Sequence, residues 1–296
     1  FPLLEPQNMH KCFIWSEIFI FQILFQNSFY LPYKKKLRIF THKIFNMEWY
    51  EVLLIISVGF IAGFLNTIAG GGSLITLPVL IFLGLPPAVA NGTNRIAIFS
   101  QNIFGVLGFR SKGVSDFPYS ISLGISAFAG AIIGAKIAVD IPGDLFNKIL
   151  AVLIVVIVLF PILKRKSSSP ENKVERKGLK YRIIGIFTFF FIGIYGGFIQ
   201  AGVGFIIIAA LTVINRFSLV KTNSIKVFVV LIYTISALFI FIIEGKIHWG
   251  YGLTLAVGNS SGSWIASRLS VKKGDNWVKW FIIVTVIALA VKLWMF

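Results

Sequence analysis

Two glycine-rich interruptions, GFLNTIAGGGS at residues 63–73 and GFIQAGVGF at residues 197–205, break hydrophobic stretches that otherwise suit a lipid bilayer. Each interruption carries an amide side chain shortly before its last glycines, Asn66 in the first and Gln200 in the second. Unpaired backbone N–H and C=O groups are costly in hydrocarbon, so a broken helix persists in a membrane only against protein or water. A pair of interrupted segments in matching positions of two halves indicates a transporter and marks its binding site.

The composition also places the chain in a bilayer. Its 296 residues are 57% hydrophobic and only 13% charged, and the mean hydropathy is +0.86. These values exclude an ordinary soluble domain and a disordered chain. A membrane helix needs about 20 apolar residues, and several continuous apolar runs of this chain meet that requirement. We therefore expect an all-α, polytopic helical membrane protein.

The net charge of +17 arises from basic residues in short loops between the apolar runs. This is the pattern of the positive-inside rule. No segment is long enough to form a soluble domain with a basic face, so we expect no nucleic-acid partner. The single cysteine, Cys12, and the three histidines form no ligand set, so neither a disulfide nor a metal site is expected. The sequence lacks HExxH and P-loop motifs, so we expect neither an enzyme nor a bound cofactor.

Residues 1–46 differ in composition from the rest of the chain, since they contain eight of the 30 Phe residues. One interpretation is an additional amphipathic or spanning helix. The other is translated upstream DNA, because the residue types in this stretch come from AT-rich codons and Met47 stands directly before the first good membrane segment. We favour the second interpretation and treat residues 1–46 as a doubtful N-terminal extension.

The rest of the chain divides into two similar halves. We expect a first membrane repeat at residues 47–163, a basic cytoplasmic linker at 164–182 and a second membrane repeat at 183–296. In each half one apolar segment, near 73–84 or 204–214, is too short for a full span. These short segments predict a broken or re-entrant helix in each half and about eight membrane helices in total.

The two halves also match at individual positions, which is typical of a duplicated transporter fold. Stripes of small residues in the fourth segment of each half predict close helix packing. The matched positions are Asn66 with Gln200, Thr93-Asn94 with Thr222-Asn223, and Gly130-x-x-x-Gly134 with Gly262-x-x-x-Ala266.

The distribution of charge predicts how the halves are oriented. If each half crosses the membrane an odd number of times, the basic groups near residues 110–112, 216–226 and 268–279 all lie on the same side as the linker. An even number would place the last two groups outside, against the positive-inside rule. We therefore expect inverted repeats in a multi-pass protein of the inner (plasma) membrane, with the linker in the cytoplasm.

The breaks are the predicted substrate site. The N-terminus of a half-helix presents free N–H groups and the positive end of a dipole, which favour an anion. Acidic residues are nearly absent from the apolar segments, and Arg95 is the best candidate for an anion-attracting cation; Lys136, Lys226 and Arg268 also lie near apolar segments. Two alternatives stay open: the glycines allow tight helix packing, and the amides form helix–helix hydrogen bonds. The predicted substrate-binding residues are Asn66, Gly70, Gly71, Gly72, Ser73, Asn94, Arg95, Gln101, Gln200, Gly202, Gly204 and Asn223.

Three stretches resemble the sulfite exporter TauE/SafE family of the TSUP superfamily. They are GFLNTIAGGGSL at residues 63–74, NGTNR at 91–95 and GFIQAGVGF at 197–205. The resemblance extends from Met47 to the C-terminus. It implies an integral inner-membrane protein with two homologous halves, whose relatives move sulfur-containing anions such as sulfite, sulfoacetate, sulfolactate or thiosulfate. Some thiosulfate importers of the superfamily use cysteines along their path, and this chain has none after residue 46.

We therefore expect a secondary transporter, and specifically an exporter, of a small sulfur-containing anion such as sulfite or an organosulfonate. A passive anion channel is one alternative. A second is a non-transporting membrane scaffold or assembly factor that binds a protein through the 164–182 linker. The expected partners are the small anion and the lipid bilayer, and a homo-oligomer is an open alternative.

Overall fold

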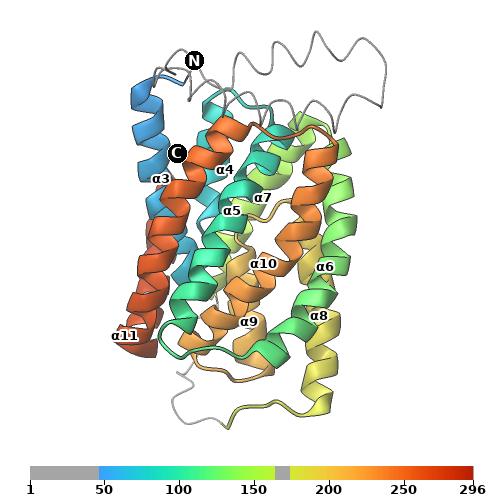
Figure 1. Ribbon diagram of the computed structural model, residues 1–296, viewed down its shortest axis with the longest axis vertical. Coiled ribbons are helices and arrows are strands. Elements are labelled where there is room, and N and C mark those ends of the chain that lie inside the picture. The colour runs from blue at the N-terminus through green and yellow to red at the C-terminus, as the bar shows by residue number, and fades with distance from the viewer. Residues whose placement is uncertain (1–46, 164–173, 296) are drawn as a thin grey trace, which may run out of the picture. The chain divides into compact units, whose positions relative to one another are not determined.

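The computed structural model describes residues 47–163 and 174–295 of the chain (Figure 1). Within these ranges the regular structure is entirely α-helical, as predicted, and no strand occurs. The expectations for residues 1–46, and for the part of the linker at 164–173, lie outside the described residues. The predicted division into domains therefore stays a prediction.

The same order of long and short helices occurs on both sides of the linker. A break divides the last helix, because Gly274 has a φ of 77° and a ψ of −176°. The helices before the linker are α3 (Trp49–Ile68), α4 (Ser73–Phe82), α5 (Pro87–Arg110), α6 (Phe117–Asp140) and α7 (Gly143–Leu163); those after it are α8 (Leu179–Phe198), α9 (Val203–Ile214), α10 (Leu219–Ile243) and α11 (Trp249–Met295).

Four of the described helices, α3, α6, α8 and α10, are long and apolar enough to cross a membrane, and α4 and α9 are shorter apolar helices. Large apolar side chains on these helices are exposed, for example Phe82 (89%) and Phe187 (67%). Such side chains suit contact with lipid, since burying apolar surface is favourable. The predicted total of about eight membrane helices stays a prediction.

Small residues let pairs of helices approach closely, which confirms the packing role predicted for their stripes. A Cβ atom added to Gly130 would lie 2.0 Å from the carbonyl oxygen of Phe190, and one added to Gly134 would lie 1.9 Å from that of Ile194. These contacts bring α6 against α8, and Gly262 similarly brings α11 against α3. Figure 1 shows α3 beside α11 and α6 beside α8.

The same contacts give the direction of the helices. Along α6 and α8 the contacts advance together, from Gly130 with Phe190 to Gly134 with Ile194, so the two helices run parallel. Gly258 and Gly262 of α11 contact Ile56 and Phe60 of α3 in the same sense. The helix α5 also runs parallel to α11, since its Gly105 and Gly108 contact Ser263 and Ser267.

It follows that α3 and α8 begin at opposite ends of the helix bundle. We call end A the end where α3, α5 and α11 begin. We call end B the end where α5 finishes at Arg110 and where α6 and α8 begin. The first break is therefore approached along α3 from end A, and the second break along α8 from end B.

Candidate functional site

Both breaks turn the chain in the same way. The N–H groups of Ala69 and Gly70 donate to the carbonyl of Leu65, and those of Ile199 and Gln200 donate to the carbonyl of Tyr195. Gly70 has a φ of 93° and Gln200 a φ of 66°, so each turn has a left-handed residue two positions after the last helical residue.

Gln200 therefore corresponds to Gly70 and not to Asn66 as the sequence comparison predicts. The predicted match is wrong by four residues, which is about one helical turn. A shift of one turn keeps the apolar face of a helix in place, and for that reason the hydrophobic pattern does not reveal it. Asn66 corresponds to Gly196.

The C-terminal carbonyls of α8 are bound by side chains of α5. The last four C=O groups of a helix have no partner within the helix. Asn91 donates from Nδ2 to the carbonyl of Phe198 at 2.7 Å, and Arg95 donates to the carbonyl of Gly196 at 3.1 Å and to that of Gly197. The carbonyl of Tyr195 accepts from the N–H groups of the turn, so each of these four carbonyls has a donor.

The C-terminal carbonyls of α3 are bound in the same manner by α10. Asn223 donates from Nδ2 to the carbonyl of Ile68 at 2.9 Å. The ammonium of Lys226 donates to the carbonyls of Asn66 at 2.9 Å and Thr67 at 2.8 Å. Each break is thus closed by one amide and one cation from the other half of the chain, which also places positive charge at the negative end of a helix dipole.

The structure places Arg95 at the C-terminal end of α8. Its side chain is fully buried, and Nη1 also donates to Oε1 of Gln200 at 3.1 Å. The guanidinium lies 4.7 Å from the ring centroid of Phe241. This placement favours a structural role, and the anion-attracting role of Arg95 stays a prediction.

The glycines of the two breaks contact one another. A Cβ atom on Gly70 would lie 2.4 Å from the Cα of Gly204, and one on Gly72 would lie 2.3 Å from the carbonyl oxygen of Ala62. The two interruptions therefore touch backbone to backbone. This supports the packing alternative for Gly70 and Gly72.

A small cavity lies beside the contact between the breaks. It has room for about one water molecule. Ser73 and Val203, the first residues of α4 and α9, both line it, so the N-termini of both half-helices face one space. The lining residues are Asn66, Ser73, Asn102, Gln200, Val203, Gly204, Lys226 and Val230.

The chemistry of the lining suits an anion. It combines one ammonium group, Lys226, with three amides, one hydroxyl and two helix N-termini, and it contains no carboxylate. The side chains of Asn66 and Ser73 have no hydrogen-bond partner among the described residues. Both side chains can therefore donate to a guest without breaking an existing bond.

Of the predicted site residues, four line the cavity: Asn66, Ser73, Gln200 and Gly204. Asn94 instead accepts a hydrogen bond from Thr76 at 2.8 Å, and Gln101 accepts one from Asn259 at 3.2 Å, so both act between helices. The other predicted residues away from this cavity are Gly70, Gly71, Gly72, Arg95, Gly202 and Asn223.

The sequence analysis did not place Asn102, Val203, Lys226 or Val230 in the site. Asn102 follows Arg95 by seven residues, which is about two turns of one helix face. That spacing is a signal for Asn102. Lys226 stands out as a cation near an apolar segment, but only the structure shows that it lies between a helix end and the cavity.

Comparisons with known proteins find similar sequences among membrane transporters. The family model described as "Sulfite exporter TauE/SafE" matches residues 55–293. A probable membrane transporter protein ORF9 of Sinorhizobium sp. is 27% identical, over 84% of this chain and 94% of its own length. The probable membrane transporter protein YfcA of Escherichia coli K12 is 29% identical, over 80% of this chain and 87% of its own length. A probable membrane transporter protein of Haemophilus influenzae is 28% identical, over 78% of this chain and 89% of its own length. No solved structure matches the chain.

Replacing Arg95 with Met should destabilise the fold. The carbonyls of Gly196 and Gly197 would lose their donors, and a buried carbonyl without a partner costs about 1–3 kcal/mol, so we expect a loss of about 2–6 kcal/mol. The thermal unfolding midpoint of the purified protein in detergent measures this. Lys112→Met, at an exposed position after α5, is the matched control, and equal midpoints for the two variants would contradict the capping role.

Proposed function

The chain belongs to the sulfite exporter TauE/SafE family, and from that membership together with its central cavity we propose that it is a secondary transporter that exports a small sulfur-containing anion, sulfite or an organosulfonate. The family and the relatives named as probable membrane transporters make it a multi-pass membrane transporter. The substrate, the direction of transport and the inner membrane as its location are our proposal.

The observation that carries the proposal is the composition of the cavity. Two half-helix N-termini and the ammonium of Lys226 surround a space lined by no carboxylate. An anion of a few heavy atoms bearing several oxygen acceptors suits this environment, because such oxygens accept charge-assisted hydrogen bonds from N–H and O–H donors. A cation would find no negative partner there.

Lys226 brings positive charge to the cavity, but its ammonium has no unused N–H to donate to an anion. Its ammonium has three donors, and all three are used by the carbonyls of Asn66 and Thr67 and by Oδ1 of Asn223 at 2.8 Å. We propose that the anion is bound directly by Asn66 and Ser73, while Lys226 attracts it through its charge in a buried setting where such attraction is strong.

The cavity has room for about one water, so it must widen to admit an anion. We propose that the halves are inverted repeats that rock against each other, with the cavity as the fixed site between them. The opposite starting ends of α3 and α8 support this arrangement. Basic residues gather at end B, including Arg110, Lys112 and Lys272, which supports a cytoplasmic end B.

Purified protein in liposomes should transport sulfite in a saturable manner that responds to a proton gradient, because the protein is a coupled carrier in this proposal. Uptake of sulfite and of organosulfonates such as sulfoacetate is measured with and without the gradient, against protein-free liposomes. Absence of flux for every sulfur anion from folded protein would overturn the substrate proposal. Flux that ignores the gradient and does not saturate would instead indicate a passive channel.

Asn66→Ala and Ser73→Ala should each weaken the apparent affinity for the transported anion. A hydrogen bond to a charged group contributes about 1.5–3 kcal/mol, so we expect a loss of about 10–150-fold. The concentration dependence of flux measures this, and the thermal midpoint should change little because neither side chain has a partner to lose. Asn147→Ala, an exposed amide on α7, is the control, and wild-type affinity in both site variants would contradict direct binding.

A further inference from the structure

A second small cavity lies next to the central one, on the side of end B. On α5, Val106 lines the second cavity one turn beyond Asn102, which lines the first. On α10, Ser224 and Phe228 line the second cavity, and each precedes by two residues a position that lines the first, Lys226 or Val230. The two cavities therefore share one face of α5 and border the same stretch of α10 from opposite sides. The second is lined by Val106, Val114, Ser115, Asp116, Phe117, Ser120, Ser224 and Phe228.

Two contacts of α10 hold the second cavity closed. The rings of Phe117 and Phe228 meet edge to face, with centroids 5.2 Å apart. The hydroxyl of Ser224 donates to the carbonyl of Val114 at 3.1 Å. These contacts join α10 of the second half to the loop and helix start that follow α5 in the first half.

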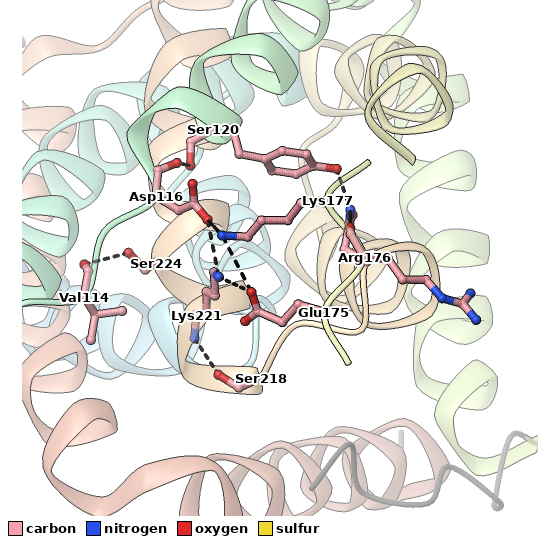
Figure 2. A network of polar contacts seen from close by, with 11 residues as sticks. Val114, Asp116, Ser120, Glu175, Arg176, Lys177, Ser218, Lys221 and Ser224 are labelled. Atoms are coloured by element: carbon pink, nitrogen blue, oxygen red, sulfur yellow. Dashed lines mark hydrogen bonds and ion pairs between the residues drawn. The ribbon is translucent and has the colours of Figure 1, made fainter. Parts of the chain in front are cut away.

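An ion-pair network lies at the wall of the second cavity, and Figure 2 shows its four charged side chains converging. Asp116 lies 2.9 Å from the ammonium of Lys177 and 3.4 Å from that of Lys221. Glu175 lies 2.6 Å from Lys221 and 3.6 Å from Lys177. We call these four residues the end-B network.

The end-B network joins three parts of the chain. Asp116 immediately precedes α6 in the first half, Lys221 lies on α10 in the second half, and Glu175 and Lys177 lie in the last part of the linker. Asp116 and Lys221 are the least exposed, at 14% and 22% of their side chains. Separation of α10 from the start of α6 would break this pair.

The linker segment is also fixed by its backbone. The N–H of Arg176 donates to the carbonyl of Asn215 at 2.9 Å. The amide of Asn215 donates back to the carbonyl of Arg176 at 2.9 Å and to the hydroxyl of Tyr119 at 2.6 Å. The end of α9, the linker and the start of α6 are therefore held together beside the network.

The charge of Asp116 is maintained in this setting. Burial alone would raise its pKa, but the hydrogen bond and charge of Lys177, together with the charge of Lys221, hold the Asp116 pKa below its usual value. The carboxylate is therefore ionised at neutral pH and both ion pairs are present.

We propose that Asp116, Glu175, Lys177 and Lys221 form the gate at end B of the transport pathway, and that the second cavity is the vestibule between this gate and the central site. The inference rests on the proposed function in that the central cavity is taken as the substrate site. The gate is closed in this structure. Partly exposed ion pairs each contribute little, so the network can break and re-form in every transport cycle.

Opening of the gate is measured by thiol labelling in the vestibule. The chain has one cysteine, Cys12, so Cys12→Ser gives a cysteine-free background in which Ser224→Cys, or separately Val106→Cys, reports access. A membrane-impermeant thiosulfonate reagent is added to each face of the reconstituted full-length protein in turn. Asp116→Asn removes two ion pairs, and we expect it to raise the labelling rate from the end-B face about 5–30-fold.

Asp144→Asn, which neutralises an exposed acid near the start of α7 at end A, is the matched control and should leave labelling slow. Glu175→Gln should raise the labelling rate as Asp116→Asn does. Unchanged labelling of both reporters in both gate variants would overturn the proposal, as would equal acceleration by Asp144→Asn. Labelling requires no transport. Faster labelling of the gate variants without any sulfite flux would therefore support the gate and would contradict only the proposal that sulfite is the substrate.

Discussion

The structure depends on how the buried carbonyls at two interrupted helix ends find donors. A break inside an apolar bundle leaves the last C=O groups of α3 and α8 without partners in their own helices, and such groups are costly in hydrocarbon. Asn91 with Arg95, and Asn223 with Lys226, bind these carbonyls. In each case the donors come from the other half of the chain, so the requirement that allows a break also joins the two halves.

This exchange of hydrogen-bond donors between the halves determines which groups lie at the centre of the helix bundle. Because α3 and α8 approach from opposite ends, their breaks meet at Gly70 and Gly204, and the half-helices α4 and α9 begin beside one cavity. The cation that closes the end of α3, Lys226, is also a wall of that cavity. One ammonium group therefore both binds the end of α3 and faces the proposed anion site. At the other break these two roles are separate, since Arg95 binds the helix end and Gln200, and only Gln200 lines the cavity.

Much of the architecture could be predicted from the sequence, because apolar runs, glycine breaks and small-residue stripes are local signals. The amides at the breaks, Asn66 and Gln200, stand out in the sequence, and both line the central cavity, although Gln200 takes the place of Gly70. The error of one turn arose because hydrophobic periodicity does not distinguish registers that differ by a turn. The carbonyl partner of Arg95 could not be predicted, since it lies 101 residues away along the chain. Asn102 shares a helix face with Arg95, but its place at the cavity depends on how α5 packs.

The central claim is that an anion binds between the two half-helix N-termini. An experimental structure of the protein in the presence of sulfite tests this most directly. We expect density for the anion in contact with the side chains of Asn66 and Ser73 and near the ammonium of Lys226, in a cavity wider than in the present structure. Sulfite bound elsewhere in the bundle, with this cavity still closed around about one water, would show that the half-helix N-termini are not the binding site.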